Sequence, residues 1–212
     1  MEIKKFQFNP FPVNTYVVWD PASKECAIID PGCYWAEELT ELKDFIAQNH
    51  LQVKYILLTH LHLDHALAVP AVKKAYGVNF CANKKDAFLL SNATQQAASY
   101  GLRLQDEPIA IDEEIREGDI FKLGQEEIHA IEVPGHSPGS IVFALPKDKK
   151  LIVGDVLFRQ SIGRTDLPGG DYQTLIDGIR GKLLSLPAET MVYSGHGPET
   201  TIGYEKDFNP FL

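Results

Sequence analysis

The segment from Thr59 to His65 concentrates residue types that bind metals. It holds three imidazoles and a carboxylate within six residues and follows the apolar run Tyr55 to Leu58. That run predicts a buried strand, and loops at strand ends are where rigid scaffolds present functional groups. A single histidine here would usually be an ordinary core or surface residue, but burying so many titratable groups without a partner would be costly. The cluster therefore predicts a metal site: Thr59-His60-Leu61-His62-Leu63-Asp64-His65.

The spacing within this segment indicates two ions. His60 and His62 are two residues apart, so in an extended chain both side chains project to one side and can bind one ion at about 2.0–2.1 Å. Asp64 and His65 are adjacent and cannot both share that projection. We expect them to serve a second ion where the chain turns into a helix, and two ions need further ligands from elsewhere in the chain.

Three further residues meet this need. His136, Asp155 and His196 each follow an apolar stretch, and each has a glycine directly before it. Glycine permits tight, often left-handed backbone geometry and lets the chain pass close to an ion. The stretches are Val133-Pro134-Gly135-His136, Ile152-Val153-Gly154-Asp155 and Tyr193-Ser194-Gly195-His196.

The whole pattern resembles the metallo-β-lactamase superfamily, whose signature is T-H-x-H-x-D-H followed by a histidine, a bridging aspartate and a last histidine. The resemblance covers nearly the whole chain and includes Asp30 in a stretch like the family's first motif. It implies a four-layer αββα sandwich of the α/β class, with the site at the edge between two sheets. It also implies two divalent ions, zinc foremost and iron or manganese as alternatives, with these ligands: His60, His62 and His136 for one ion, Asp64, His65 and His196 for the other, and Asp155 bridging both.

Such a pair of ions would lower the pKa of a bridging water and supply hydroxide as the nucleophile, so no serine or cysteine is needed. Asp64 or Asp155 would handle the proton, and the sequence leaves that choice open. Asp30 is expected outside the ligands, orienting a histidine or pinning the motif loop, with a simple turn before Pro-Gly as the alternative. Arg164 and Asp166 either brace a loop as an ion pair or contact substrate.

Several helices and short strands must position these residues. The order, strand-rich at first and then alternating, fits two sheets with helices outside them and one domain over 1–212. The expected strands are 2–8, 13–19, 25–30, 55–58, 79–82, 119–123, 127–133, 140–145, 151–154 and 190–194. The expected helices are 35–50, 66–76, one beginning near Asn83, 171–183 and 199–207.

Composition excludes several partners. The net charge of −9 and pI near 5.2 disfavour nucleic acid and anionic membranes. No apolar run reaches the roughly 18 residues that span a bilayer, and the start lacks a signal-peptide core, so we expect a cytoplasmic protein. Cys26, Cys33 and Cys81 form no disulfide framework and are expected to be buried thiols. His50, which ends a helix where a cation suits the macrodipole, and His129, in a strand without a glycine loop, are not expected to bind metal.

Within the superfamily, His62 stands where flavodiiron proteins carry glutamate, secreted β-lactamases would need a signal peptide, and RNA-processing members would need basic surface. The chain resembles most the glyoxalase II group, especially its short bacterial variants, which hydrolyse thioesters such as S-lactoylglutathione. The ending Asp207 to Leu212 comes soon after the last ligand, so we expect weak recognition of the glutathione portion. The alternatives are a mononuclear-iron persulfide dioxygenase and a noncatalytic metal-binding or regulatory module.

Overall fold

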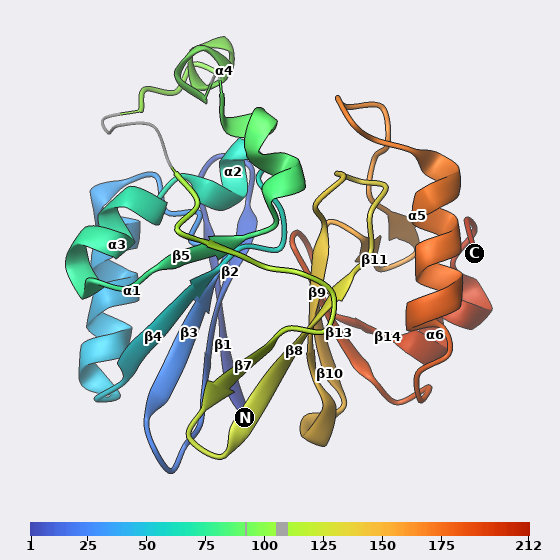
Figure 1. Ribbon diagram of the computed structural model, residues 1–212, viewed down its shortest axis with the longest axis horizontal. Helices are drawn as coiled ribbons and strands as arrows, with labels where there is room; N and C mark the ends of the chain where they lie inside the picture. The colour runs from blue at the N-terminus through green and yellow to red at the C-terminus, as the bar shows by residue number, and fades with distance from the viewer. Residues whose placement is uncertain (92, 105–109) are drawn as a thin grey trace.

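Two mixed β-sheets face each other, and helices cover their outer faces (Figure 1). The computed structural model describes residues 1–91, 93–104 and 110–212. Residues 2–114 form the first six-stranded sheet and residues 120–201 form the second. The expected α/β class and four-layer αββα sandwich are confirmed.

The first sheet has the strand order β1-β2-β3-β4-β5-β6. Strands β3 to β6 run parallel to one another, so the chain leaves β3, β4 and β5 at the same edge of the sheet. The residues that follow these three strands are therefore brought together. The strands are β1 (Glu2–Phe8), β2 (Val13–Trp19), β3 (Glu25–Ile29), β4 (Gln52–Leu57), β5 (Phe80–Ala82) and β6 (Glu113–Glu114).

The second sheet has the order β14-β13-β10-β9-β8-β7. Because β9 pairs antiparallel with both β8 and β10, and β10 pairs parallel with β13, strands β8, β10 and β13 all end at one edge. A small hairpin, β11 (Leu157–Phe158) with β12 (Ser161–Ile162), follows β10. The strands are β7 (Ile120–Leu123), β8 (Glu126–Glu132), β9 (Ile141–Leu145), β10 (Lys150–Gly154), β13 (Met191–Ser194) and β14 (Thr200–Thr201).

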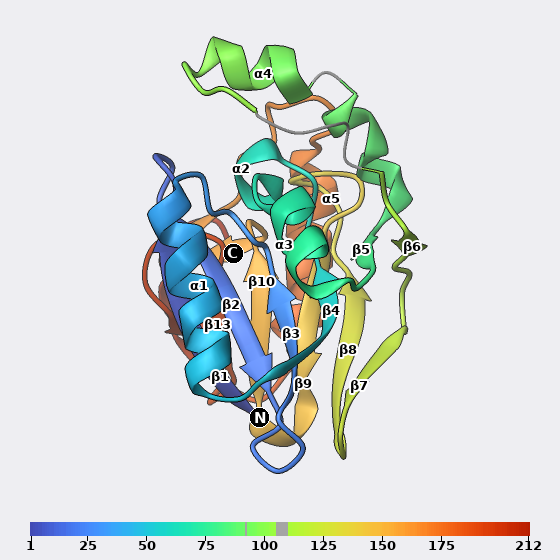
Figure 2. The ribbon, with the colours of Figure 1, turned by 90° about the vertical axis from the view of Figure 1, so that its left-hand side faces the viewer.

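Alternating side chains along the strands build three apolar layers. Ile29 and Phe143 point between the sheets, whereas their neighbours Ile28 and Val142 point outward under the helices. The outer layer on the first sheet packs against α1 (Ala36–Gln48) and α3 (Val69–Tyr76), and the one on the second sheet packs against α5 (Tyr172–Gly178), η3 (Ile179–Leu183) and α6 (Ile202–Phe208). Figure 2 shows α1 and α3 on the outer face of the first sheet.

The helix expected over 66–76 is wrong in its continuity. The chain instead forms α2 (Leu63–Ala66) and then α3, which has Pro70 in its first turn. Proline lacks the amide hydrogen that a continuous helix would require and its ring clashes with the preceding turn, so the helix restarts there. A short 3₁₀ helix, η2 (Pro146–Asp148), was not expected from the sequence.

The other helices agree in place and differ at their ends. Asn83 caps a 3₁₀ helix, η1 (Lys84–Leu90), and α4 (Ala93–Ser99) follows. The helix expected over 171–183 is capped by Asp171 and changes from α5 to the π-helix η3. The terminal helix, α6, starts after Thr201, which caps it in place of the expected start at 199.

All three cysteines are buried and free, as expected, and burial raises the pKa of Cys26 and Cys81 to about 12. Such thiols are protonated at neutral pH and poor nucleophiles. Of the helices that the structure describes, none is both long and apolar enough to cross a membrane.

Candidate metal centre

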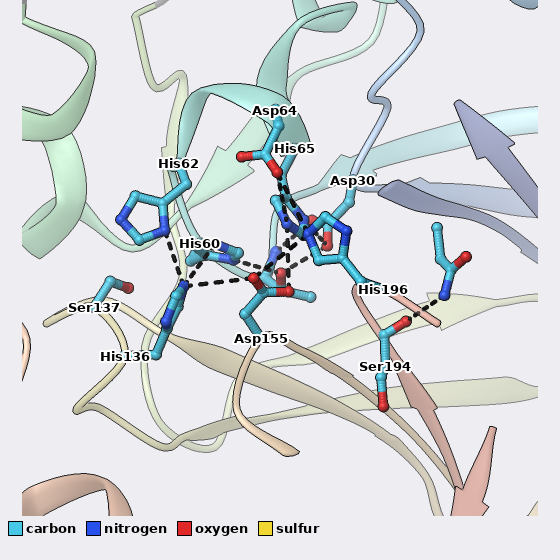
Figure 3. Close-up of polar contacts among 12 residues, drawn as sticks. Asp30, His60, His62, Asp64, His65, His136, Ser137, Asp155, Ser194 and His196 are labelled. Atoms are coloured by element: carbon cyan, nitrogen blue, oxygen red, sulfur yellow. Dashed lines mark hydrogen bonds and ion pairs between the residues drawn. The ribbon is translucent and has the colours of Figure 1, made fainter. Parts of the chain in front are cut away.

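The seven residues that the sequence singled out lie together where the two sheets share an edge (Figure 3). The first sheet supplies the segment after β4, and the second supplies the residues after β8, β10 and β13. The parallel directions of these strands explain why positions far apart in the chain meet here. The residues that come together are His60, His62, Asp64, His65, His136, Asp155 and His196. His50 and His129 lie outside these groups.

The first group consists of His60, His62 and His136. The Nε2 atom of His136 lies 2.9 Å from Nδ1 of His62 and 3.2 Å from Nε2 of His60. Nitrogens that bind one tetrahedral ion at 2.0–2.1 Å are about 3.3–3.4 Å apart. The three imidazoles therefore converge with nearly the spacing of ligands to a single ion.

The second group consists of Asp64, His65 and His196. Oδ2 of Asp64 lies 3.4 Å from Nε2 of His196 and 3.8 Å from Nε2 of His65. Asp155 lies between the groups: its Oδ2 is 3.7 Å from Nε2 of His136 and 3.6 Å from Nε2 of His196. Its position fits a carboxylate shared by two ions.

In two of the histidine rings, a hydrogen bond made by Nδ1 outside the site determines that Nε2 faces the site. Nδ1 of His136 donates to the backbone oxygen of Arg164 at 2.8 Å, and Nδ1 of His65 donates to Oδ2 of Asp30 at 3.0 Å. Nε2 is therefore the nitrogen of each ring that faces the site, as in proteins whose metal-binding histidines donate to a carboxylate or carbonyl. Asp30 also accepts from the amide and hydroxyl of Thr59, so it pins the motif loop as well as a ring.

The polar atoms that face the space between the groups support the fit to metal ions. Nε2 of His65 and Oδ1 of Asp155 are buried and have no hydrogen-bond partner among the described residues. Leaving buried polar atoms unpaired is costly unless a ligand satisfies them. Imidazole and carboxylate together suit zinc, iron and manganese, so the donor set fits divalent cations.

Electrostatics differ between the two groups. Burial, together with His136 and His65, lowers the pKa of His62 to about 4, and burial also holds the pKa of His60 well below its usual value. These rings are neutral at pH 7 and keep their lone pairs. His60 and His62 can therefore bind a cation without losing protons.

The second group is richer in carboxylates. Burial alone would lower the pKa of His65, but Asp64, Asp155 and Asp30 raise it well above the usual value. Burial alone would raise the pKa of Asp155, but His65 and His196 keep it well below the usual range. The carboxylates are ionised at neutral pH and concentrate negative charge where a cation would bind.

The glycines that precede His136, Asp155 and His196 do not all serve the same purpose. Gly135 and Gly154 adopt φ of 129° and 51°, as expected for a left-handed backbone. Gly195 does not, which corrects the expectation for that position. A Cβ there would overlap Oδ1 of Asp155 and lie 2.8 Å from Cε1 of His65, so Gly195 provides space for the ligands.

A comparison with protein families decides the affiliation. The model described as the metallo-beta-lactamase superfamily matches residues 8–196. The chain belongs to the metallo-beta-lactamase superfamily. It is 42% identical to a protein of Haemophilus influenzae named hydroxyacylglutathione hydrolase GloC, covering 100% of this chain and 98% of that one.

Two solved structures of the superfamily fold are similar over the full length. The structure titled BLEG-1 B3 metallo-beta-lactamase superposes with a TM-score of 0.86 at 38% identity, covering 100% of this chain and 99% of that one. The structure titled TTHA1623 in a di-iron-bound form superposes with a TM-score of 0.86 at 35% identity, covering 99% and 100%. Fold and family thus agree with the resemblance seen in the sequence.

The candidate metal centre opens into a cavity of about 330 Å³. Arg164 lines it, but its guanidinium is exposed and binds Asp166 through two contacts of 2.7 and 2.8 Å. An exposed pair of this kind contributes little to stability. Sequence reasoning did not find several other lining residues, because no local motif marks them: Phe11, Leu63, Gln96, Tyr100 and Leu167.

Proposed function

We propose that this chain is a dinuclear metal-dependent hydrolase of thioesters, acting on S-lactoylglutathione or a similar hydroxyacyl thioester. The observation that carries the proposal is the pair of ligand groups with Asp155 between them at the base of an open cavity. The name of the Haemophilus relative supports the thioester class. That relative is covered over 98% of its length, so a chain of this size is compatible with that name.

The ligand roles follow the two groups. His60, His62 and His136 would hold one ion, and the second group would hold the other. Two divalent ions held there would lower the pKa of a water molecule between them and polarise the substrate carbonyl. The ligands of the second ion would be Asp64, His65 and His196, and Asp155 would be shared by both ions.

Asp64 and Asp155 are the proposed catalytic carboxylates. Both line the cavity, and Asp64 is the more exposed of the two, at 21% against 14% of the side chain. Burial would raise the pKa of Asp64, but His65 and His196 lower it, so it is ionised at neutral pH and able to accept a proton. Asp155 is directed between the two groups and serves first to bind and orient.

The cavity walls would orient the acyl portion of the substrate. Phe11 and Tyr100 pack edge to face with ring centroids 5.3 Å apart, and Leu167 lines the same cavity. This apolar wall excludes water from one side of the reacting carbonyl. Arg164 also lines the cavity and would contact an anionic portion of the substrate.

Anaerobic thioester hydrolysis tests the proposal. Protein loaded with zinc or manganese should hydrolyse S-lactoylglutathione and a lactoyl thioester of a small thiol without oxygen. The release of free thiol measures the rate. Comparing KM for the two esters measures how much the glutathione portion contributes to binding. Absence of turnover on both esters in fully loaded protein would reject the proposal.

The second candidate function is β-lactam hydrolysis, favoured by the 38% identity to the structure titled BLEG-1 B3 metallo-beta-lactamase. Parallel assays on a penicillin and a cephalosporin separate the two. Glutathione persulfide supplied with oxygen and iron-loaded protein tests the dioxygenase alternative. Oxygen uptake that requires iron, with thioesters untouched, would favour that alternative.

The native metal requires its own measurement, since the donor set accepts zinc, iron and manganese. Elemental analysis of protein from unsupplemented cells should give close to two equivalents. A firm single equivalent under metal-replete conditions would contradict the dinuclear assignment. A title that describes a di-iron form of a 35% identical protein makes iron a specific possibility to measure.

A further inference from the structure

A second buried carboxylate, Asp86, lies beside the metal centre without belonging to either ligand group. It is on η1, the 3₁₀ helix that follows β5, and its side chain is completely buried. Asn83 caps this helix and accepts from the amide of Lys85, which fixes the first turn. Because β5 runs parallel to β4, the helix starts at the edge where the segment from His60 begins.

Asp86 binds both loops that carry the first group. Its Oδ2 accepts from the amide of Leu61 at 3.2 Å, and Leu61 lies between His60 and His62. The same oxygen accepts from the hydroxyl of Ser137 at 2.7 Å, next to His136. One carboxylate oxygen therefore joins a loop of the first sheet to a loop of the second.

The other oxygen makes the attachment to the second sheet rigid. Oδ1 of Asp86 accepts from the amide of Gly139 at 2.6 Å, and Oγ of Ser137 also lies 2.8 Å from Oγ of Ser140. A Cβ on Gly139 would lie 2.8 Å from Cγ of Asp86. Gly139 has no left-handed backbone, so the glycine here provides room for the carboxylate.

Asp30 makes the corresponding contacts for the second group, through His65 and Thr59. Asp86 touches no ligand side chain of that group. We propose that Asp86 is a positioning residue for the first group: it sets the separation between the pair His60 and His62 on one sheet and His136 on the other. This inference rests on the proposed function, in which that group holds an ion.

Asp86→Asn is the direct test. The amide keeps the shape of the side chain but turns a donor toward the amide of Leu61 or of Gly139, so one attachment is lost. Changes just outside the ligands typically weaken metal affinity about 10- to 100-fold. We expect a loss of that size for one equivalent of Zn²⁺ or Co²⁺, measured by competition with a chromophoric chelator, and less than about a twofold change for the other.

Two background variants assign the effect to a group. In His196→Ala, which lacks a ligand of the second group, Asp86→Asn should weaken the remaining equivalent 10- to 100-fold. In His136→Ala, which lacks a ligand of the first group, Asp86→Asn should change nothing. Equal weakening of metal binding in both backgrounds, or no weakening in either, would overturn the positioning role.

Matched variants separate positioning from stability. Asp112→Asn removes a carboxylate that also accepts from an amide of β5, that of Phe80, but lies away from the ligand loops; it should leave both equivalents unchanged. Gly139→Ala should reproduce the selective loss, and Ser137→Ala a smaller one, should Asp86→Asn fold poorly. Wild-type protein that binds no metal would reject the proposed function, whereas normal wild-type binding with unaffected variants would reject this inference alone.

Discussion

At the scale of single residues, Asp155 differs from Asp30 in what its carboxylate faces. Asp30 has all its bonds within the protein, to Thr59 and His65, whereas Oδ1 of Asp155 is buried without a hydrogen-bond partner among the described residues. The carboxylate of Asp30 is fully hydrogen-bonded within the chain, whereas that of Asp155 has an oxygen available to a ligand in the cavity.

Replacing these two residues should therefore have unequal effects. Asp30→Ala removes an orienting group and should cost about 10- to 100-fold in activity or metal affinity. Asp155→Ala removes the residue shared by both groups and should cost more, with loss of both equivalents. Steady-state kinetics and elemental analysis of the two variants check this, and equal, mild effects would contradict the bridging role.

Gly195 gives a second test at this scale. Gly195→Ala should abolish metal binding while leaving the protein folded, because its Cβ would displace Asp155 and His65 without straining the backbone. Gly181→Ala is the control: nothing lies within 4 Å of its Cβ position in η3, and alanine there should stabilise the fold by about 0.5–1 kcal/mol. Circular dichroism, urea unfolding and metal titration of both variants distinguish the effects.

At the scale of elements, the start of β2 anchors the loop that carries His196. Asn14 is fully buried, and its Nδ2 donates to the backbone oxygens of Ser194 and Gly197 at 3.0 and 2.9 Å, 180 residues or more along the chain. Its own amide donates to Gly195 at 2.7 Å. The first sheet thus holds the last ligand-bearing loop of the second.

Asn14→Ala should destabilise the protein by about 1–3 kcal/mol, because it removes two hydrogen bonds of about 0.5–1.5 kcal/mol each, to the backbone oxygens of Ser194 and Gly197. It should also weaken the ion bound by Asp64, His65 and His196 more than the other. Asn79→Ala, which removes an exposed amide, should stay within about 0.5 kcal/mol of wild type. Urea unfolding of metal-free protein measures both effects. Equal changes in stability for the two substitutions would count against the anchoring role.

Contacts of this length set the limit of what the sequence could predict. The strand ends, the motif loop and the glycine-histidine stretches are local patterns, and the structure brings them together where strand directions require. The break before Pro70 was not predicted, although proline in a helix interior is a local signal. Asp86, by contrast, contacts Ser137 51 residues away and carries no motif, and Tyr100 reaches the cavity only through the placement of α4.

At the scale of the whole molecule, each proposed ion would join the two sheets. Each group combines residues that follow β4 with a residue from the second sheet, His136 or His196. A ligand present at 100 times its dissociation constant stabilises the native state by about 2.7 kcal/mol. Ions bound in these groups would therefore help to hold the two sheets together.

Removing metal with a chelator should lower Tm by roughly 5–10 °C, given about 2–4 °C per kcal/mol for a chain of this size. Adding back zinc should restore it. His129→Ala, outside both groups, should show the same shift, whereas His196→Ala should show a smaller one. A Tm that does not respond to chelation in protein shown to contain metal would contradict this cross-linking role.

The division of the chain into two successive sheets also has a consequence for its synthesis. When residues up to about Glu114 have left the ribosome, the first sheet can form, but the face bearing Ile29 and Leu57 has no second sheet to cover it. Incomplete chains with such faces are prone to aggregate, and chaperones bind them. We expect the nascent half-molecule to need that protection, and loading of the ion assigned to Asp64, His65 and His196 to wait until His196 has been translated.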